Sequence, residues 1–427
     1  MQEYLALPPV AIASGRGGWL TDTEGRTYLD GNASVWTNVH GHNDPDLNAA
    51  LVRQLGRVAH STMLGLTHPV GAELAAELAA LTAGGLPRVF FSDNGSTAVE
   101  IALKLSFQYW QLTGRPGKTG VIALAGGYHG DTFGTMAVGD SGGFHDRFRT
   151  WCFARETFPA PHCREWAGRI HGSDMTASLA ALRTLLAARA ASTACLIMEP
   201  SVQGAAGMQL QPPGFLRAVA ELCREHEVHL IVDEVFVAFG RLGSLLVSPE
   251  EGVTPDFLCL AKGLTAGYLP LAATLAREDI YAAFLGTYES HRAFYHGHTF
   301  TGNPLGAAVA LENIRKLREL IGGGVLDGRI AHFGRAVGAA FTGHPHVRAL
   351  RQRGLTAALD LAPAGGGVFP PGDRVGLQVC LRARDHGLLL RPLGDTLLLV
   401  PPLCLTPDEL DQLVGRTVRA LGDILPA

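Results

Sequence analysis

The sequence predicts an α/β protein whose central sheet is mostly parallel and is covered by helices. The chain has 427 residues, 47% of them hydrophobic, which is enough to fill the core of one large unit or of two interlocked domains. Short, almost entirely apolar runs alternate with segments of helical character, and this alternation is typical of parallel sheets buried on both faces. We expect strands at residues 88–92, 121–125, 194–200, 228–234, 256–260 and 271–276, and helices at residues 94–111, 174–190, 213–227 and 303–320.

The two ends of the chain have a different character. Residues 16–30 indicate a β-hairpin with its turn at Glu24-Gly25, and helices are expected from Asp46 onward and over residues 69–83. After about residue 325, short strands, a Gly/Pro-rich insert, a helix, a pair of strands and a last helix indicate a compact α+β unit. We therefore predict a large domain over residues 46–324 and a smaller α+β domain built from residues 1–45 and 325–427.

Composition argues against several kinds of partner. The net charge is −4 and no basic patch stands out, so we expect binding neither to nucleic acid nor to an anionic membrane. No apolar run approaches the roughly 20 residues needed to cross a bilayer, and the N-terminus lacks the pattern of a signal peptide, so we expect a cytoplasmic protein. The seven cysteines form no CxxC pair, and we expect them to be buried, reduced thiols. We also expect no metal site.

Two strands within residues 228–264 end in groups of opposite charge. Asp233 ends the run VHLIVDE, and Lys262 directly follows DFLCLA. A lysine at a buried strand end loses solvation, which lowers its pKa and makes its amine a nucleophile suited to Schiff-base chemistry. A carboxylate at the carboxyl end of a strand is placed to hold a pyridinium nitrogen protonated. Taken alone, Lys262 is equally well explained as a surface lysine, and Asp233 as a strand-capping or metal-binding acid.

Three further motifs give weaker signals. Residues 91–97, FSDNGST, lie where a strand turns into a helix, and small residues there let the first helical amides face an anion such as phosphate. On its own, an ordinary helix cap explains that turn better. Tyr128, in the loop GGYHG, suits stacking on a planar cofactor as well as a simple loop position. Arg391, between apolar strands, suits bidentate binding of a substrate carboxylate or an ion pair between domains.

Together these motifs resemble those of the class III (subgroup II) aminotransferases, which are fold-type I pyridoxal-phosphate enzymes. The matching segments stand in the family's order: FSDNGSTAVEIALK, GGYHGDTFG, IMEPSVQGAAG, LIVDEV with FGR, CLAKGL and HGHTFTGNPLGAAVALENI. The resemblance runs from about Gly25 to the C-terminus. It implies a mostly parallel seven-stranded sheet, pyridoxal 5'-phosphate as cofactor, and a homodimer with shared active sites.

Within this family the chain looks most like the branch that aminates 7-keto-8-aminopelargonate to 7,8-diaminopelargonate in biotin synthesis. The segments that carry this finer resemblance are SVWTNVHGH, HSTMLGLTH, SFQYWQ, YHGDTFGTMAVG and LLLRPLGDTLLLVPPL. The branch implies S-adenosylmethionine or lysine as the amino donor.

The family resemblance also assigns roles to residues of this chain. Lys262 is implied to be the Schiff-base lysine, which also moves the proton during the reaction, and Asp233 to pair with the pyridine nitrogen. Tyr128 and Val235 are implied to cover opposite faces of the cofactor ring. Arg391 is implied to bind the carboxylate of the keto substrate.

Two sets of residues are assigned to the cofactor site and to the substrate site. The other cofactor-binding residues are implied to be Gly95, Ser96 and His129, together with His298 and Thr299 reaching the phosphate from the partner subunit. The substrate pocket is implied to be lined by Val35, Trp36, Tyr128, Glu199, Gly297 and Arg391.

The chain departs from the family pattern at three places. It begins at MQEY, where relatives usually carry a segment with a pocket-lining aromatic residue, and a misassigned start codon is our hypothesis for this end. Val35 and His298 stand where enzymes that use S-adenosylmethionine carry a second tryptophan and a proline. These forms resemble the lysine-using branch, so both donors stay open. Phe236, Val237 and Ala238 follow DEV where the family has smaller residues, and we expect them to narrow the site or to shift its specificity.

Two other functions stay open at this point. One is a different class III transaminase, acting on an ω-amino acid, a diamine or acetylornithine. The arginine that acetylornithine enzymes use for the α-carboxylate has no clear counterpart here, which weakens that option. The other is a protein of the same fold without transaminase activity, and the intact pair of Lys262 and Asp233 argues against it.

Overall fold

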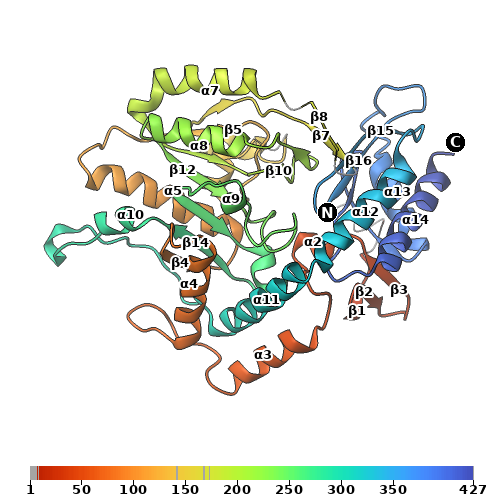
Figure 1. Cartoon of the computed structure of the whole chain (residues 1–427), viewed down its shortest axis with the longest axis horizontal. Helices are drawn as coiled ribbons and strands as arrows, with labels where there is room; N and C mark the ends of the chain where they lie inside the picture. The colour runs from red at the N-terminus through yellow and green to blue at the C-terminus, as the bar shows by residue number, and fades with distance from the viewer. Residues whose placement is uncertain (1–6, 8, 141–142, 167–168, 173, 427) are drawn as a thin grey trace.

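A seven-stranded sheet forms the centre of the computed structural model, which describes residues 7, 9–140, 143–166, 169–172 and 174–426 (Figure 1). The strand order is β4-β14-β13-β12-β9-β5-β6. Neighbouring strands are parallel except at β14, which is antiparallel to both β13 and β4. The bounds are β4 (Arg88–Ser92), β5 (Gly120–Leu124), β6 (Glu156–Phe158), β9 (Thr193–Met198), β12 (His229–Asp233), β13 (Phe257–Leu260) and β14 (Ala272–Ala276). The predicted fold class is thus confirmed.

Helices cover this sheet on both faces, because successive side chains of a strand point to opposite sides. Ile231 of β12 belongs to the apolar cluster that contains the inner face of α5 (Gly95–Leu112). Leu230 and Val232, its neighbours on the same strand, belong to the cluster formed with the helices of the opposite face. Those helices are α4 (Pro69–Leu81), α7 (Thr176–Arg189), α8 (Phe215–Glu225) and α11 (Pro304–Gly322).

The N-terminal hairpin and the C-terminal part of the chain fold together, as Figure 1 shows for the strands coloured red and the elements coloured blue. The first of two four-stranded sheets has the order β1-β2-β3-β17, and β17 is parallel to β3. The second has the order β15-β16-β19-β18. The bounds are β1 (Ile12–Arg16), β2 (Trp19–Asp22), β3 (Thr27–Asp30), β15 (Val347–Gln352), β16 (Ala357–Leu361), β17 (Leu388–Leu389), β18 (Arg391–Leu393) and β19 (Thr396–Leu399). The division into two domains at residues 45/46 and 324/325 stays a prediction.

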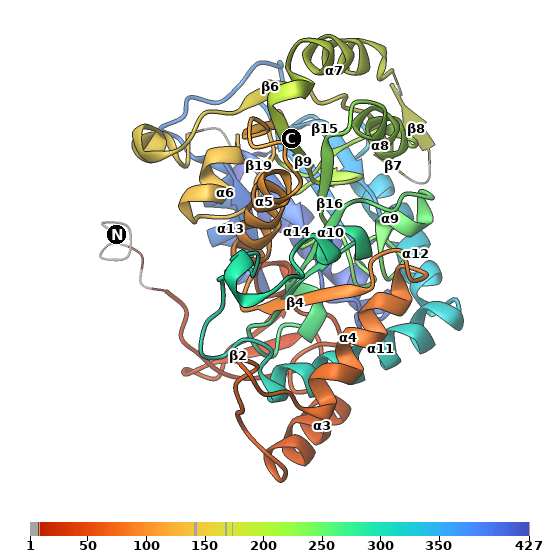
Figure 2. The same cartoon turned by 90° about the vertical axis from the view of Figure 1, so that its left-hand side faces the viewer.

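The remaining elements connect or flank these sheets. Figure 2 shows α3 (Pro45–Leu55) and α4 next to α11, which contacts both. Helices α12 (Val325–Phe341), α13 (Val375–Asp385) and α14 (Pro407–Ile424) accompany the C-terminal strands. The shorter elements are α2 (Ala33–Trp36), α6 (Phe133–Val138), α9 (Val247–Glu250), α10 (Glu278–Ala283), β7 (Arg164–Trp166), β8 (Arg169–His171), β10 (Val202–Gln203), β11 (Gln209–Leu210) and the 3₁₀ turns η1 (Asp146–Trp151), η2 (Ala190–Ser192), η3 (Lys262–Thr265) and η4 (Tyr288–Ser290). In the described residues, no helix combines the length and the apolar character that crossing a membrane requires.

Helix α12 is the largest element that the sequence analysis did not predict. Three glycines within it lower its intrinsic helix propensity. Leu326, Phe333, Val337 and Phe341 are nevertheless buried along one side, so tertiary packing stabilises this helix. The first of the two strands expected before the last helix, at residues 388–393, is split: β17 joins the N-terminal sheet, and β18 pairs with β19.

The parallel strands bring their carboxyl ends to one edge of the central sheet. At this edge β12 ends at Asp233, β9 ends just before Glu199, and β13 ends two residues before Lys262. Strand β4 leads there into the first turn of α5, and β5 leads into the loop that contains Tyr128. Open α/β sheets bind ligands at this edge.

Candidate active site

A cavity of about 1180 Å³ lies at the carboxyl edge of the sheet. Eleven of the residues that the family resemblance assigns to the cofactor and substrate sites line it, although they come from distant parts of the chain. They are Val35, Trp36, Gly95, Ser96, Tyr128, His129, Glu199, Asp233, Val235, Lys262 and Arg391.

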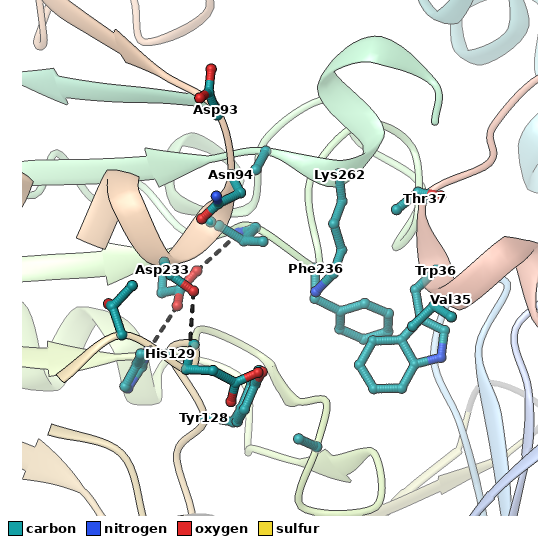
Figure 3. Close-up of a pocket in the computed structure, with 18 of the residues that line it drawn as sticks. Val35, Trp36, Thr37, Asp93, Asn94, Tyr128, His129, Asp233, Phe236 and Lys262 are labelled. Carbon is teal, nitrogen blue, oxygen red and sulfur yellow. Dashed lines mark hydrogen bonds and ion pairs between the residues drawn. The ribbon is translucent and has the colours of Figure 1, made fainter. Parts of the chain in front are cut away.

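Lys262 projects into this cavity from the segment that follows β13 (Figure 3). Its backbone φ is 42°, in the left-handed region, a strained conformation for a residue other than glycine and one that recurs at functional sites. Burial lowers the pKa of its amine, and the carboxylates of Asp233 and Glu199 act in the opposite direction. A lowered pKa increases the neutral fraction of the amine, which is the nucleophilic form.

The Asp233 carboxylate is held on both oxygens. His129 Nδ1 lies 2.8 Å from Oδ2, and the amide of Val235 donates to Oδ1 at 3.1 Å. The side chains of Asp233 and His129 are both buried. This contact fixes the imidazole with its Nδ1–H toward the carboxylate and orients the carboxylate in turn.

The first turn of α5 faces the same cavity. Asn94 caps this helix: its side chain accepts from Thr97 N at 3.1 Å, and its own amide donates to Thr97 Oγ1 at 3.2 Å. The next two amides, of Gly95 and Ser96, have no acceptor within the helix and lie at the positive end of its dipole. A Cβ on Gly95 would lie 2.8 Å from Val235, so only glycine lets the turn approach that closely. The turn is therefore suited to an anion such as phosphate.

Glu199 joins two loops at the floor of the cavity. Its carboxylate accepts from Tyr128 N at 3.0 Å and from Gly204 N at 2.9 Å. Burial raises the pKa of Glu199 to about 7. Burial also raises the pKa of Tyr128 to about 12, so this side chain is a neutral phenol at neutral pH.

Phe236 is the member of the Phe236–Val237–Ala238 triplet that reaches the cavity. Its ring centroid lies 4.9 Å from that of Trp36. Val237 and Ala238 are buried in the core and do not line the cavity, so the expected narrowing is confined to Phe236. On the substrate side, Arg391 forms no ion pair with any described residue, so the structure gives no support to a pairing between domains.

Three residues of the HGHT segment, Gly297, His298 and Thr299, are not among the described residues that line the cavity of their own chain. His298 Nδ1 lies 3.5 Å from the carboxylate of Asp93, which does line it. The roles assigned to this segment involve the partner subunit, and they stay predictions.

The cavity also has walls that the sequence analysis did not identify. Asn94 is one, and its place next to Gly95 in the quoted motif was the available signal. Others lie just after recognised residues: Asp131 and Thr132 follow the Tyr128 loop, and residues 267–271 follow Lys262. Phe133 lies in the quoted motif GGYHGDTFG, whereas Phe144 and Phe148 carried no signal, because they come from a segment without any quoted motif.

This set of groups fits pyridoxal 5'-phosphate. Lys262 offers an amine for the aldehyde, and Asp233 offers a carboxylate for the ring nitrogen. The free amides at the start of α5 offer a phosphate site, and Gly95, Ser96 and Val235 all line the same cavity. The residues present thus supply each kind of contact that the cofactor needs.

Comparisons with known proteins agree with this chemistry. The family model described as aminotransferase class-III matches residues 2–421. An adenosylmethionine-8-amino-7-oxononanoate aminotransferase from Geobacter sulfurreducens is 45% identical over 99% of this chain and 94% of its own. The crystal structure of the enzyme of that name from Methanocaldococcus jannaschii has a TM-score of 0.92 at 34% identity, over 99% of this chain and 95% of its own.

A second solved structure is a PLP-bound amine transaminase from an uncultivated Pseudomonas species, with a TM-score of 0.85 at 34% identity over 98% of this chain and 94% of its own. The family match covers nearly the whole chain, and the cavity holds the groups that this chemistry requires. The chain belongs to the class III aminotransferases, which are pyridoxal-phosphate-dependent enzymes.

Proposed function

We propose that this enzyme transfers an amino group to 8-amino-7-oxononanoate, also called 7-keto-8-aminopelargonate, and so makes 7,8-diaminopelargonate for biotin synthesis. The observation that carries this proposal is the 45% identity, over almost the full length of both chains, to a relative named for this reaction. The cavity supports it, since it combines apolar walls with an unpaired cation at Arg391, which suits a long-chain keto acid with a terminal carboxylate.

In the proposed reaction, the residues of the cavity have different roles. When bound, the cofactor supplies an electron sink for the carbon whose amino group is exchanged. The Asp233 carboxylate holds the ring nitrogen protonated, and the α5 amides at Gly95 and Ser96 hold the phosphate. Lys262 Nζ removes a proton from the substrate carbon and returns it to another position. Donor and acceptor use the same cavity in turn, which is a ping-pong sequence.

Two amino donors are proposed, and different observations favour each. The names of the relatives contain adenosylmethionine, which favours S-adenosylmethionine. Val35, which lines the cavity where a second tryptophan would stand in enzymes with that donor, favours lysine. A half-reaction with each donor separates them.

We further propose that the enzyme works as a cytoplasmic homodimer whose active sites are shared. Supporting this, the segments on either side of Gly297 and around Leu64 carry large exposed apolar side chains, and such surfaces mark protein interfaces. Leu64 lies beside Gly297, and the rings of His60 and Phe300 pack at 4.7 Å. The exposed apolar residues of these segments include Val52, Leu55, Leu64, Leu66, Leu285, Tyr288, Tyr295 and Phe300.

A second candidate function is amine transamination with a broader range of substrates. The similarity to the Pseudomonas amine transaminase favours it, at a TM-score of 0.85 and 34% identity. The unpaired Arg391 argues for a carboxylate-bearing substrate and therefore for the first proposal.

The test of the proposed function is a pair of half-reactions followed by absorbance of the bound cofactor. The enzyme is mixed separately with S-adenosylmethionine, lysine, glutamate and ornithine, and 8-amino-7-oxononanoate is then added. We expect one of the first two donors to change the spectrum and the keto acid to reverse that change, with neither effect in Lys262→Ala. A spectrum that 8-amino-7-oxononanoate leaves unchanged would remove the substrate assignment and leave the family unaffected.

A further inference from the structure

The amine of Lys262 rests against aromatic rings. Its Nζ lies 5.2 Å from the ring centroid of Trp36 and 5.8 Å from that of Phe236, and in Figure 3 both rings stand on the side of the amine away from Asp233. Among the described residues, none forms a hydrogen bond or ion pair with this amine. Both distances are within the roughly 6 Å over which a ring face attracts a cation.

The two rings are held in place from behind. Trp36 Nε1 donates to Asn32 Oδ1 at 3.0 Å, and both aromatic side chains are less than a tenth exposed. A Cβ on Gly204 would lie 3.1 Å from Phe236 and 3.4 Å from Trp36, so a glycine at this position leaves room for both rings.

The turn that carries Trp36 is strained. All four residues of α2 have positive φ values between 46° and 69°, although none is glycine. Such a conformation costs on the order of 1 kcal/mol or more per residue, and it persists only when its surroundings impose it. Here Asp30 imposes it by accepting from the amides of Asn32 and Ser34. This strained backbone places the indole of Trp36 next to the amine of Lys262.

The ring pair of Trp36 and Phe236 suits a lysine that must alternately bind the cofactor and release it. A carboxylate in direct contact would hold the amine charged and occupy its hydrogens. A ring face stabilises the ammonium through its quadrupole and leaves every N–H and, after proton loss, the lone pair free. The other groups that face this part of the cavity are Asp233 with His129, Glu199, Tyr128, Asp131, His145, Asp93 and Arg391.

We propose that Trp36 and Phe236 are positioning residues that hold the ammonium of Lys262 during the part of the reaction in which the lysine is detached from the cofactor. This inference deepens the proposed transaminase function but depends only on the family chemistry, and the identity of the keto substrate does not enter it. The rings raise the affinity of the detached amine for its proton, against the effect of burial. Lys262 is therefore available to return that proton to the substrate.

The test measures the proton affinity of Lys262 directly. The chain has only four lysines, Lys104, Lys118, Lys262 and Lys316, so each can be followed by peptide mapping. The holoenzyme is first converted to its amino form by an amine donor, which detaches Lys262, and is then treated with cyanate over a range of pH. Cyanate is small and reacts with neutral amines through its protonated form, isocyanic acid, so rates are corrected for the fraction of isocyanic acid at each pH. The other three lysines serve as internal references.

Three variants are compared with the wild type. Phe236→Leu keeps apolar bulk and removes the ring face, and we expect the midpoint for Lys262 to fall by about one pH unit, which is the size of a desolvated cation–π contact. Phe236→Tyr keeps a ring and should keep the wild-type midpoint. Val237→Ala, at the adjacent buried position that does not line the cavity, should also leave it unchanged.

A second measurement uses the other ring. Trp36→Leu should lower the midpoint in the same direction, and the acid limb of the kcat profile should move to lower pH with it in both leucine variants. An unchanged or raised midpoint in Phe236→Leu, or an equal fall in Phe236→Tyr, would overturn the proposal. Failure of 8-amino-7-oxononanoate as substrate would not affect this result, because any amine donor that gives the amino form is sufficient.

Discussion

The Asp233 carboxylate is fixed at both oxygens by groups of the protein itself. His129 Nδ1 and the amide of Val235 are its partners, and Figure 3 shows His129 on the far side of Asp233 from Lys262. A preoriented charge stabilises a developing charge without reorganising at the moment of reaction. This geometry therefore suits the role that the family resemblance assigns to Asp233, which is to pair with the pyridine nitrogen of the cofactor.

Asp233→Asn should separate cofactor binding from turnover. The amide keeps the shape of the side chain and loses its charge, so we expect retention of the cofactor by Lys262 and a fall in kcat of about 10²–10³-fold. Bound cofactor is measured by absorbance and kcat by product formation. A kcat within a few-fold of the wild type would contradict the role of Asp233.

Glu199 should make stability depend on pH. Burial raises its pKa from 4.5 to about 7, so between these values the folded chain holds a proton that the unfolded chain has lost. The free energy of unfolding therefore falls as pH rises from about 4.5 to about 7, by about 3 kcal/mol from this group.

Glu199→Gln removes this titration and serves as the reference. We expect the wild type to lose unfolding free energy relative to the variant as the pH rises across that range. Urea denaturation measures both free energies. A difference that stays constant from pH 4.5 to 7.5 would show that Glu199 does not titrate as described.

Among the single elements, helix α5 connects the local sequence to the proposed phosphate site. The pattern FSDNGST predicted a strand-to-helix turn, and the structure adds the reciprocal cap between Asn94 and Thr97. This cap leaves the amides of Gly95 and Ser96 as the free donors of the first turn.

Two substitutions at Asn94 should separate the cap from the anion site. Asn94→Ala removes the acceptor and should cost about 1 kcal/mol of unfolding free energy, with weaker binding of the cofactor. Asn94→Asp keeps the acceptor and adds a negative charge, so stability should be kept while cofactor affinity falls. Equal cofactor affinity in Asn94→Asp and wild type would contradict a phosphate site at this turn.

Elements differ in how far the sequence predicts them. The strands β9, β12 and β13 are fully buried, and their apolar runs predicted that these segments are strands of a mostly parallel sheet. Their order in that sheet was not predicted, because it depends on long-range pairing. The left-handed turn at α2 was not predictable, because none of its residues is glycine, and the local hydrogen bonds that Asp30 accepts from the amides of Asn32 and Ser34 follow no pattern that was recognised in the sequence. The pairing of Trp36 with Phe236 joins residues 200 positions apart in sequence, and no local pattern marks it.

At the scale of the whole molecule, buried arginines join the central sheet region to the C-terminal strands. Arg241, in the FGR motif, donates to the carbonyls of Leu355 and Pro401 at 2.9 and 2.7 Å. Arg351 donates to the carbonyl of Gly207, in the segment that follows Glu199. These contacts tie the C-terminal sheet, whose strand β18 carries Arg391, to the segments that follow β12 and β9. The sequence identified the FGR motif but not this mechanical role, because its partners are backbone carbonyls.

Arg241→Met should weaken this connection. The substitution leaves two buried carbonyls without a donor, and we expect a loss of about 2–4 kcal/mol in unfolding free energy. The matched control is Arg315→Met, on the exposed surface of α11, where an ion pair with Glu312 contributes little and the loss should stay below about 1 kcal/mol. Similar losses in the two variants, measured by urea denaturation, would contradict a connecting role for Arg241.

Isotope transfer measures whether this enzyme moves an amino group onto 8-amino-7-oxononanoate. The enzyme is incubated with that keto acid and with S-adenosylmethionine or lysine whose transferable amino nitrogen is isotope-labelled, and the products are analysed by mass spectrometry. We expect labelled 7,8-diaminopelargonate with one of the two donors in the wild type and none in Lys262→Ala. A wild-type enzyme that binds the cofactor and transfers label to other ketones, but yields no labelled diaminopelargonate with either donor, would contradict the proposed function.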